Sequence, residues 1–171
     1  MSFCRDRFMA CLPAGAHILD AGCGSGRDSK VFMEHGFAVT AMDASGKMCG
    51  EATELLGQKV LQLSFAEMNF LNEFDGIWAC ASLLHVAENE IHPVMENMKK
   101  ALKPQGVLYA SFKYGTEERT AQERLFHDYN ESSLKELLEV HGFLVCDIFI
   151  TKDVRTDRAK EMWVNALARL K

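Results

Sequence analysis

Short, mainly apolar runs alternate along the chain with segments whose apolar residues recur every three or four positions. The apolar runs cover residues 16–21, 37–43, 59–64, 74–82, 106–113 and 143–150. Such runs are typical of strands covered on both faces, and the periodic segments between them are typical of helices packed on one side. Strict alternation of strand and helix predicts an α/β fold with a parallel sheet wound on both faces.

Three helical segments can be bounded from their residues. A short amphipathic helix is expected before the break at 13–15, because helical spacing relates Cys4, Phe8, Cys11 and Leu12. In 89–106, Pro104 and Gly106 are expected to end a helix whose apolar face consists of Ile91, Val94, Met95, Met98 and Leu102. A third helix runs from about Glu131 to His141, with Asn130 as its N-cap and Gly142 as its C′ residue.

Two segments are harder to assign from their pattern. In 161–170, Trp163, Ala166, Leu167 and Leu170 fit one helical face, although the same length suits a strand, and the pattern favours a helix. The segment 113–130 is polar with interleaved aromatic residues, which is typical either of a substrate-binding insertion or of a solvated connector.

Composition indicates one globular domain over residues 1–171. The chain is 48% hydrophobic and 25% charged, with a formal net charge of −5, and it has no dense Lys/Arg run. A nucleic-acid or anionic-membrane partner is therefore not expected, and a small molecule is the better candidate. The six cysteines form no CxxC pair, and no signal peptide or membrane span is visible, so we expect reduced thiols and a cytoplasmic location.

In HILDAGCGSGRD, residues 17–28, the first expected strand runs directly into a glycine-rich turn. In open α/β sheets such a turn lets the backbone approach a ligand at the strand's carboxyl end. A dinucleotide fingerprint starting at Gly22 would need a small residue where Arg27 stands. Asp20 beside the loop would repel a pyrophosphate and attract an ammonium group, so the expected ligand carries positive charge.

The second expected strand ends in Asp43. An acidic residue at this place can accept hydrogen bonds from both hydroxyls of a ribose. The alternative interpretation is that Asp43 is only the N-cap of the following helix. The glycine loop and Asp43 together predict a ligand that contains a ribose.

The motifs ILDAGCGSG, VTAMDAS, FDGIWACASLLHV and LKPQGVLYASF, in this order, resemble those of class I S-adenosylmethionine (SAM)-dependent methyltransferases over roughly residues 13 to 150. GCGSGRDS with the third motif is most similar to the small-molecule branch that includes tellurite-resistance-type methyltransferases. The resemblance implies a Rossmann-like α/β/α sandwich with a seven-stranded, mostly parallel sheet. It also implies that 161–170 is the last, antiparallel strand, contrary to the helical pattern.

The resemblance implies SAM as cofactor and S-adenosylhomocysteine (SAH) as product, and it assigns roles by motif position. The residues implied at the cofactor are Asp20, Gly22, Cys23 and Gly24 at the methionine part, Asp43 and Ala44 at the ribose, Ala66 and Glu67 at the adenine, and Ala81, Ser82 and Leu83 past the sulfonium. No metal is expected, and the absence of an NPPY-like sequence after the fourth strand disfavours methylation of DNA bases.

Acceptor-side candidates carry alternatives. His85 is the candidate acid/base residue, and a purely structural role for it is given equal weight. Arg27 is a candidate for binding an acidic substrate, and the alternative is an ion pair with Asp28. Phe126 and Tyr129 are candidate walls of the acceptor pocket, and His127 is a second acid/base candidate. The alternative is that the aromatic residues of this segment only pack on the sheet edge. His92 is expected to serve packing or to lie at the surface.

The expected function is methyl transfer to a small molecule. Residues 1–15 are short for the N-terminal lid of such enzymes, so we expect a truncated start, a minimal form or a subunit completed by its neighbour. A noncatalytic SAM-binding module and a nicotinamide-dependent oxidoreductase are the alternatives, because fold alone does not separate an enzyme from a binding module.

Overall fold

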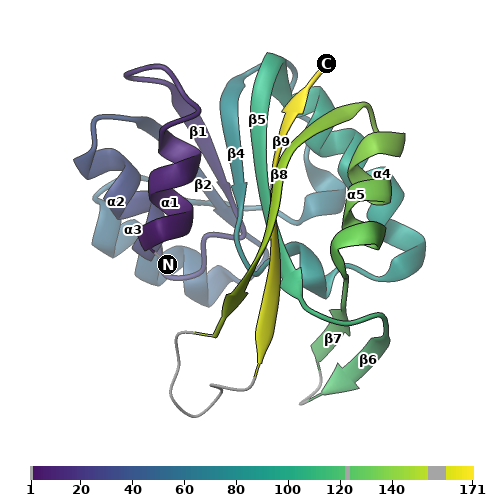
Figure 1. The fold of residues 1–171 in the computed structure, drawn as a ribbon. Coiled ribbons are helices and arrows are strands. Elements are labelled where there is room, and N and C mark those ends of the chain that lie inside the picture. The colour runs from purple at the N-terminus through teal and green to yellow at the C-terminus, as the bar shows by residue number, and fades with distance from the viewer. Residues whose placement is uncertain (1, 122–123, 154–160) are drawn as a thin grey trace.

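The computed structural model describes residues 2–121, 124–153 and 161–171, and within them the chain forms a three-layer α/β/α sandwich (Figure 1). The central sheet has seven strands in the order β3-β2-β1-β4-β5-β9-β8. Strands β1 to β5 pair in parallel, and β9 pairs antiparallel with both β5 and β8. The Rossmann-like fold implied by the resemblance is therefore confirmed.

The apolar runs predicted as strands all lie in this sheet. Their bounds are β1 His17–Ala21, β2 Ala38–Asp43, β3 Leu61–Gln62, β4 Phe74–Ala79, β5 Leu102–Lys113 and β8 Phe143–Lys152. The final segment is a strand, β9 Met162–Leu170, so its helical pattern was misleading. Because β9 lies between β5 and β8 with both faces covered, Val164–Ala168 are all buried, and a continuous apolar run contains helical spacing by chance.

Helices cover both faces of the sheet. The first face carries α1 Ser2–Met9, α2 Arg27–Glu34 and α3 Gly46–Leu56, and the second carries α4 Glu88–Ala101 and α5 Glu131–Val140. On the second face, Ile91, Val94, Met95 and Met98 of α4 pack into the largest core cluster, as their spacing predicts. α4 ends at Ala101, three residues before Pro104, because β5 already begins at Leu102.

The cap of α5 is as predicted. The Asn130 side chain accepts a hydrogen bond from the Ser133 N–H, and Gly142 follows the helix with φ +84°. The preceding polar segment contains a two-stranded hairpin that the sequence did not indicate, β6 Glu118–Ala121 and β7 Arg124–His127. Two 3-10 turns, η1 Phe65–Glu67 and η2 Leu83–His85, follow β3 and β4.

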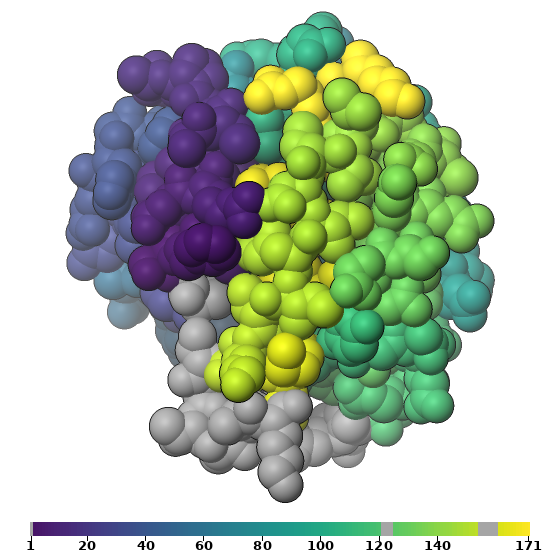
Figure 2. All heavy atoms as spheres, in the orientation of Figure 1, coloured from purple at the N-terminus to yellow at the C-terminus, as the bar shows by residue number. Residues whose placement is uncertain are grey.

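Helix α1 packs against α2, β4 and β8. Its buried Phe8 packs against the rings of Phe32 and Trp78, at centroid distances of 5.8 Å and 5.3 Å. Arg7 forms an ion pair with Asp147 of β8, and the purple N-terminal residues lie beside the yellow-green residues of β8 in Figure 2. Among the described residues, each helix is too short or too polar to cross a bilayer.

Candidate functional site

A cavity of about 690 Å³ opens where β1, β2 and β4 end and the glycine loop turns into α2. We call it the glycine-loop cavity. Seven of the predicted site residues line it: Gly22, Gly24, Asp43, Ala44, Ala81, Ser82 and His85. The carboxyl ends of parallel strands meet at one edge of the sheet, so the topology brings these separate motifs together.

Asp43 lies at the centre of this arrangement. Its Oδ2 accepts a hydrogen bond from the Gly24 N–H at 2.9 Å, and its Oδ1 accepts one from the Ser45 N–H at 2.8 Å. The N-cap of α3 is Ser45, whose side chain accepts from the Met48 N–H, so Asp43 is not that cap. Each carboxylate oxygen keeps a second lone pair, which leaves Asp43 able to accept ribose hydroxyls.

Residue 22 must be a glycine because β1 and the segment after β4 approach each other closely there. It has φ +83°, and a Cβ added to it would lie 2.4 Å from the Ser82 Cβ. The Ser82 hydroxyl in turn donates to the Ala21 carbonyl at 2.7 Å. A glycine here therefore permits the hydrogen bond that closes the floor of the glycine-loop cavity.

The cavity is also lined by residues that the motifs did not single out: Lys47, Met48, Leu63, Ser64, Phe65 and Leu125. Ala66 and Glu67, predicted near the adenine, are not among the lining residues. Glu67 instead accepts from the Ser64 N–H at 3.0 Å and from its hydroxyl at 2.5 Å, which closes the turn η1. The compact 3-10 turn places Leu63–Phe65 at the cavity in place of Ala66 and Glu67.

Asp20, Cys23 and Leu83 lie behind the cavity wall. Asp20 is 2% exposed and accepts a hydrogen bond from the Ser29 hydroxyl at 2.6 Å, so it lies beneath the loop, where burial raises its pKa to about 7. Cys23 packs toward the cluster under α3, and Leu83 is fully buried in the main core. None of the three side chains lines the glycine-loop cavity.

His85 lines the glycine-loop cavity with its ring held from two sides. Its Nδ1 lies 2.7 Å from the Leu125 carbonyl oxygen, and Phe126 meets its ring edge-on at a centroid distance of 5.0 Å. A carbonyl can only accept, so Nδ1 carries a proton, and in the neutral ring Nε2 presents its lone pair. This bond to the backbone is the structural role considered for His85, and it also leaves a basic nitrogen.

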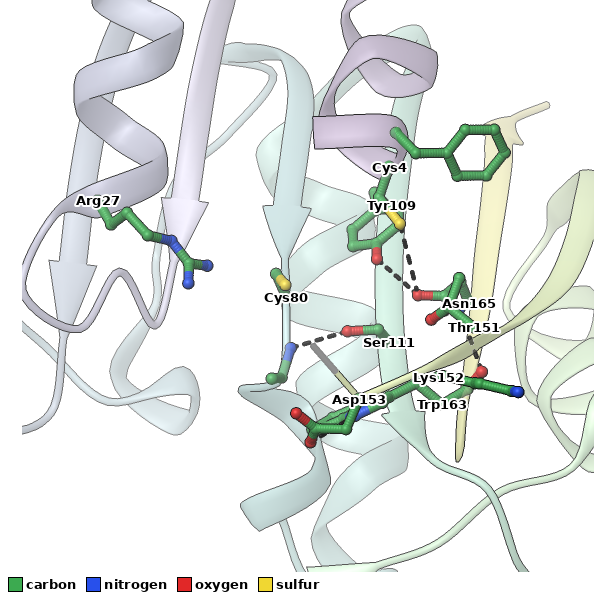
Figure 3. Close-up of a pocket in the computed structure, with 12 residues that line it drawn as sticks. Cys4, Arg27, Cys80, Tyr109, Ser111, Thr151, Lys152, Asp153, Trp163 and Asn165 are labelled. Carbon is green, nitrogen blue, oxygen red and sulfur yellow. Dashed lines mark hydrogen bonds between the residues drawn. The ribbon is translucent and has the colours of Figure 1, made fainter. Parts of the chain in front are cut away.

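A second cavity, of about 330 Å³, is lined by residues of α1, β5, β8 and β9, by Arg27 and by the segment after β4, and we call it the Arg27 cavity (Figure 3). Arg27 lines it, and its Nε and Nη2 donate to the two oxygens of Asp28 at 2.9 Å and 3.0 Å. Ala81 lines both cavities. Its N–H donates to the Ser111 hydroxyl at 2.9 Å, and its φ of +53° is uncommon for a residue other than glycine.

Phe126, Tyr129 and His127 do not line the Arg27 cavity. Tyr129 packs on Phe112 and lines a third cavity with His127 and His92, while Phe126 contacts His85. His92 is exposed on α4, as the surface alternative expected, and its Nδ1 lies 3.0 Å from His141 Nε2. Among the described residues, no group of three or more His, Cys, Asp or Glu side chains could hold a metal ion.

The parallel sheet, the glycine loop and the acidic residue ending β2 define the class as a Rossmann-like domain, and such domains typically bind a ribose-containing ligand at this edge of the sheet. A family model described as a methyltransferase domain matches residues 18–106, more than half of the chain. The chain therefore belongs to the methyltransferase domain family, and the resemblance to SAM-dependent methyltransferases is confirmed at that level.

Individual relatives agree with this assignment. The chain is 32% identical over 100 residues to the O-methyltransferase resE of Aspergillus sclerotiorum, covering 53% of this chain and 37% of the relative. It is similar to 1,6-didemethyltoxoflavin-N1-methyltransferase of Burkholderia thailandensis, solved with 1,6-didemethyltoxoflavin and SAH bound, at 25% identity and a TM-score of 0.84. The match covers 98% of this chain and 76% of that one.

A TehB-like SAM-dependent methyltransferase from Corynebacterium glutamicum has the same fold, at 21% identity and a TM-score of 0.75. Its match covers 98% of this chain and 88% of that chain. The chain spans less than half the length of the curated relatives it matches, with 37%, 47% and 42% of the first three covered.

Proposed function

We propose that the chain transfers the methyl group of SAM to a small-molecule acceptor. The observation that carries this proposal is the meeting of two cavities at Ala81, one built around Asp43 and the other around Arg27. Such an arrangement suits two reactants that approach each other from opposite sides. Holding reactants in line in this way can remove about 7 to 11 kcal/mol from a barrier.

The glycine-loop cavity fits SAM in size and chemistry. Its volume of about 690 Å³ lies in the usual range for small-molecule sites. In this proposal Asp43 accepts the ribose hydroxyls, Leu63 and Phe65 border the adenine, and Ala81 and Ser82 border the sulfonium end. Asp20 lies beneath the glycine loop, on the side of the methionine part. Bound SAM supplies an electrophilic methyl group, which bonds to the acceptor's lone pair while the S–CH₃ electron pair stays on sulfur as a thioether.

His85 is our candidate for accepting a proton from an acceptor that loses one on methylation. Because its Nδ1 donates to the Leu125 carbonyl, Nε2 is the nitrogen able to take a proton. A His85→Asn variant keeps a side-chain donor near that carbonyl and removes the base. It should lower kcat with little change in SAH affinity, whereas loss of a purely structural histidine should weaken SAH binding as well.

Several observations support a small acceptor. The net charge of −5 is unlike that of nucleic-acid-binding proteins, and the Burkholderia relative is named for methylation of a small heterocycle. The motif GCGSGRDS supports a place near the tellurite-resistance-type branch, which agrees with the fold of the TehB-like structure.

Calorimetric titration with SAH, with NAD in parallel, tests the cofactor assignment. We expect one SAH per chain and no binding of NAD. Asp43→Asn should weaken SAH binding by about tenfold or more, because it removes a charge-assisted acceptor. Glu54→Gln removes the same charge from the exposed side of α3 and should leave the affinity unchanged. Binding of NAD instead of SAH would support the oxidoreductase alternative, and SAH binding without turnover on any acceptor would support a noncatalytic module.

A further inference from the structure

Five of the twelve described residues that line the Arg27 cavity are aromatic or carry a thiol. Phe3 and Cys4 come from α1, Cys80 follows β4, Tyr109 lies on β5 and Trp163 lies on β9. Burial raises the pKa of the Cys80 thiol to about 12, so this wall is neutral at physiological pH. At about 330 Å³, the cavity is at the small end of the range for ligand sites, which suits a molecule of one or two rings.

The buried polar groups at the far end of the cavity already have partners. The Asn165 side-chain oxygen accepts from the Tyr109 hydroxyl at 2.7 Å. Its amide nitrogen donates to the Phe149 carbonyl and to the Thr151 hydroxyl, each at 3.1 Å. These groups hold β5, β8 and β9 together, so this side of the cavity is a rigid surface suited to the face of a ring.

Arg27 lies on the opposite side and is held in a fixed orientation. In Figure 3 its side chain projects toward the cavity, across from Tyr109 and Asn165. Asp28, which is 6% exposed, also accepts from Arg5 at 2.6 Å and from the Trp78 indole N–H at 3.1 Å. A guanidinium has five N–H donors, so Arg27 can keep both bonds to Asp28 and still donate to a ligand.

The charges around Arg27 favour an anion. Two guanidiniums, those of Arg5 and Arg27, face the single carboxylate of Asp28. Burial would raise the pKa of Asp28, but hydrogen bonds and charge from Arg27, followed by Arg5 and Trp78, hold it below its usual range. At the other end Lys113 pairs with Asp153 and Glu161, and Lys152 also lines the cavity. Among the described residues the two lysines and two carboxylates there balance, so the excess positive charge lies at the Arg27 end.

Resting on the proposed function, we propose that the methyl acceptor is a small aromatic carboxylic acid. Its carboxylate would bind the outer N–H groups of Arg27, and its ring would lie against the aromatic wall formed by Phe3, Tyr109 and Trp163. Arg27 is then a specificity-determining residue. Asp28 is a positioning residue, because it acts through Arg27.

The test compares acids with their neutral analogues on the full chain saturated with SAH. The probes are the three hydroxybenzoate isomers and the three corresponding hydroxybenzamides, titrated by calorimetry or ligand-observed NMR. We expect the best acid to bind at least about fivefold more tightly than its amide, a modest ratio because the Arg27 side chain is 61% exposed. Arg27→Gln should abolish this preference. Arg119→Gln, which removes an arginine on β6 paired with Asp128, should retain it.

Each result bears on the inference. Equal binding of acids and amides to the wild-type chain, or an acid preference that survives Arg27→Gln, would overturn it while leaving SAH binding and the proposed function intact. Failure of the wild-type chain to bind SAH would overturn both. Phe3→Ala provides a second variant, which should weaken acid and amide alike, because it removes apolar wall without changing charge.

Discussion

The carboxyl group of Asp20 is buried beneath the glycine loop, and its titration should be visible in the pH dependence of the chain's stability. Burial raises its pKa from 3.8 to about 7. Between these values the folded chain holds a proton that the unfolded chain releases, so stability falls as the pH rises through this window. The full effect is on the order of 4 kcal/mol.

Asp20→Asn removes this titration while keeping an acceptor for the Ser29 hydroxyl. We expect the variant to have a flatter stability profile from pH 4 to pH 7 and a higher Tm than wild type at pH 8. Thermal melts across this range measure both quantities. Asp6→Asn, at an exposed position of α1, is the matched control and should keep the wild-type slope. Parallel profiles for wild type and Asp20→Asn would contradict the argument.

Ala81 adopts a left-handed backbone conformation at the boundary of the two cavities, with φ +53°. Glycine adopts this conformation without strain but gains entropy in the unfolded chain, so Ala81→Gly should change the free energy of unfolding by less than about 1 kcal/mol. Valine is β-branched, and Ala81→Val should cost more than about 1 kcal/mol and weaken SAH binding. Urea titrations test this order, with Ala38→Val on β2 as a control at an exposed strand position. Equal stabilities for the two Ala81 variants would show that backbone strain is not the cause.

At the scale of elements, the sequence predicted the strands of the sheet better than the connections. Six strands and the cap of α5 followed from apolar runs and turn residues, because burial on both faces removes polar alternation. The same burial made β9 look helical, and only the resemblance to a family corrected that prediction. The hairpin β6–β7 was missed because its residues are polar and carry no clear period.

The residues of the candidate site that lie at strand ends could be predicted from the sequence. Gly24 follows β1, and Asp43 ends the neighbouring parallel strand β2, so their contact follows from topology. The turn η1 is irregular, and its internal hydrogen bonds to Glu67 decide which residues reach the cavity. In the Arg27 cavity, Arg27 and Ala81 were predicted as site residues, but Phe3 of α1, Thr151 of β8 and Trp163 of β9 lie outside the motifs, so no local pattern indicated that they would join the wall.

Helix α1 offers a direct separation of core packing from cavity lining. Phe8 is fully buried, so Phe8→Ala should cost about 3 to 5 kcal/mol of stability. Phe3 is 55% exposed, so Phe3→Ala should cost less than about 1 kcal/mol while altering the Arg27 cavity. Urea denaturation of both variants checks the difference. A similar loss from both would mean that α1 contributes to stability as a unit and not through Phe8.

At the scale of the whole molecule, the arrangement of the sheet sets the order of local stability. β1, β4 and β5 have strands on both sides and helices on both faces, whereas β6–β7 is an isolated two-stranded sheet. Isolated hairpins are marginally stable, so the hairpin amides should exchange first and those of β1 and β4 last. The cofactor is therefore expected to bind to the loops at one edge of a sheet that is already rigid without it.

Hydrogen exchange measured with and without SAH tests that expectation across the molecule. Binding should slow exchange in the segments that line the glycine-loop cavity, 22–24, 42–48, 63–65 and 81–86. Exchange in α5, on the opposite side of the sheet from α3, should change little. At a hundredfold excess over Kd, SAH should also stabilise the fold by about 2.7 kcal/mol, which a thermal shift detects. Protection confined to α5 and β8 would place the ligand elsewhere and contradict the site, while uniform protection would indicate that binding orders the whole sheet.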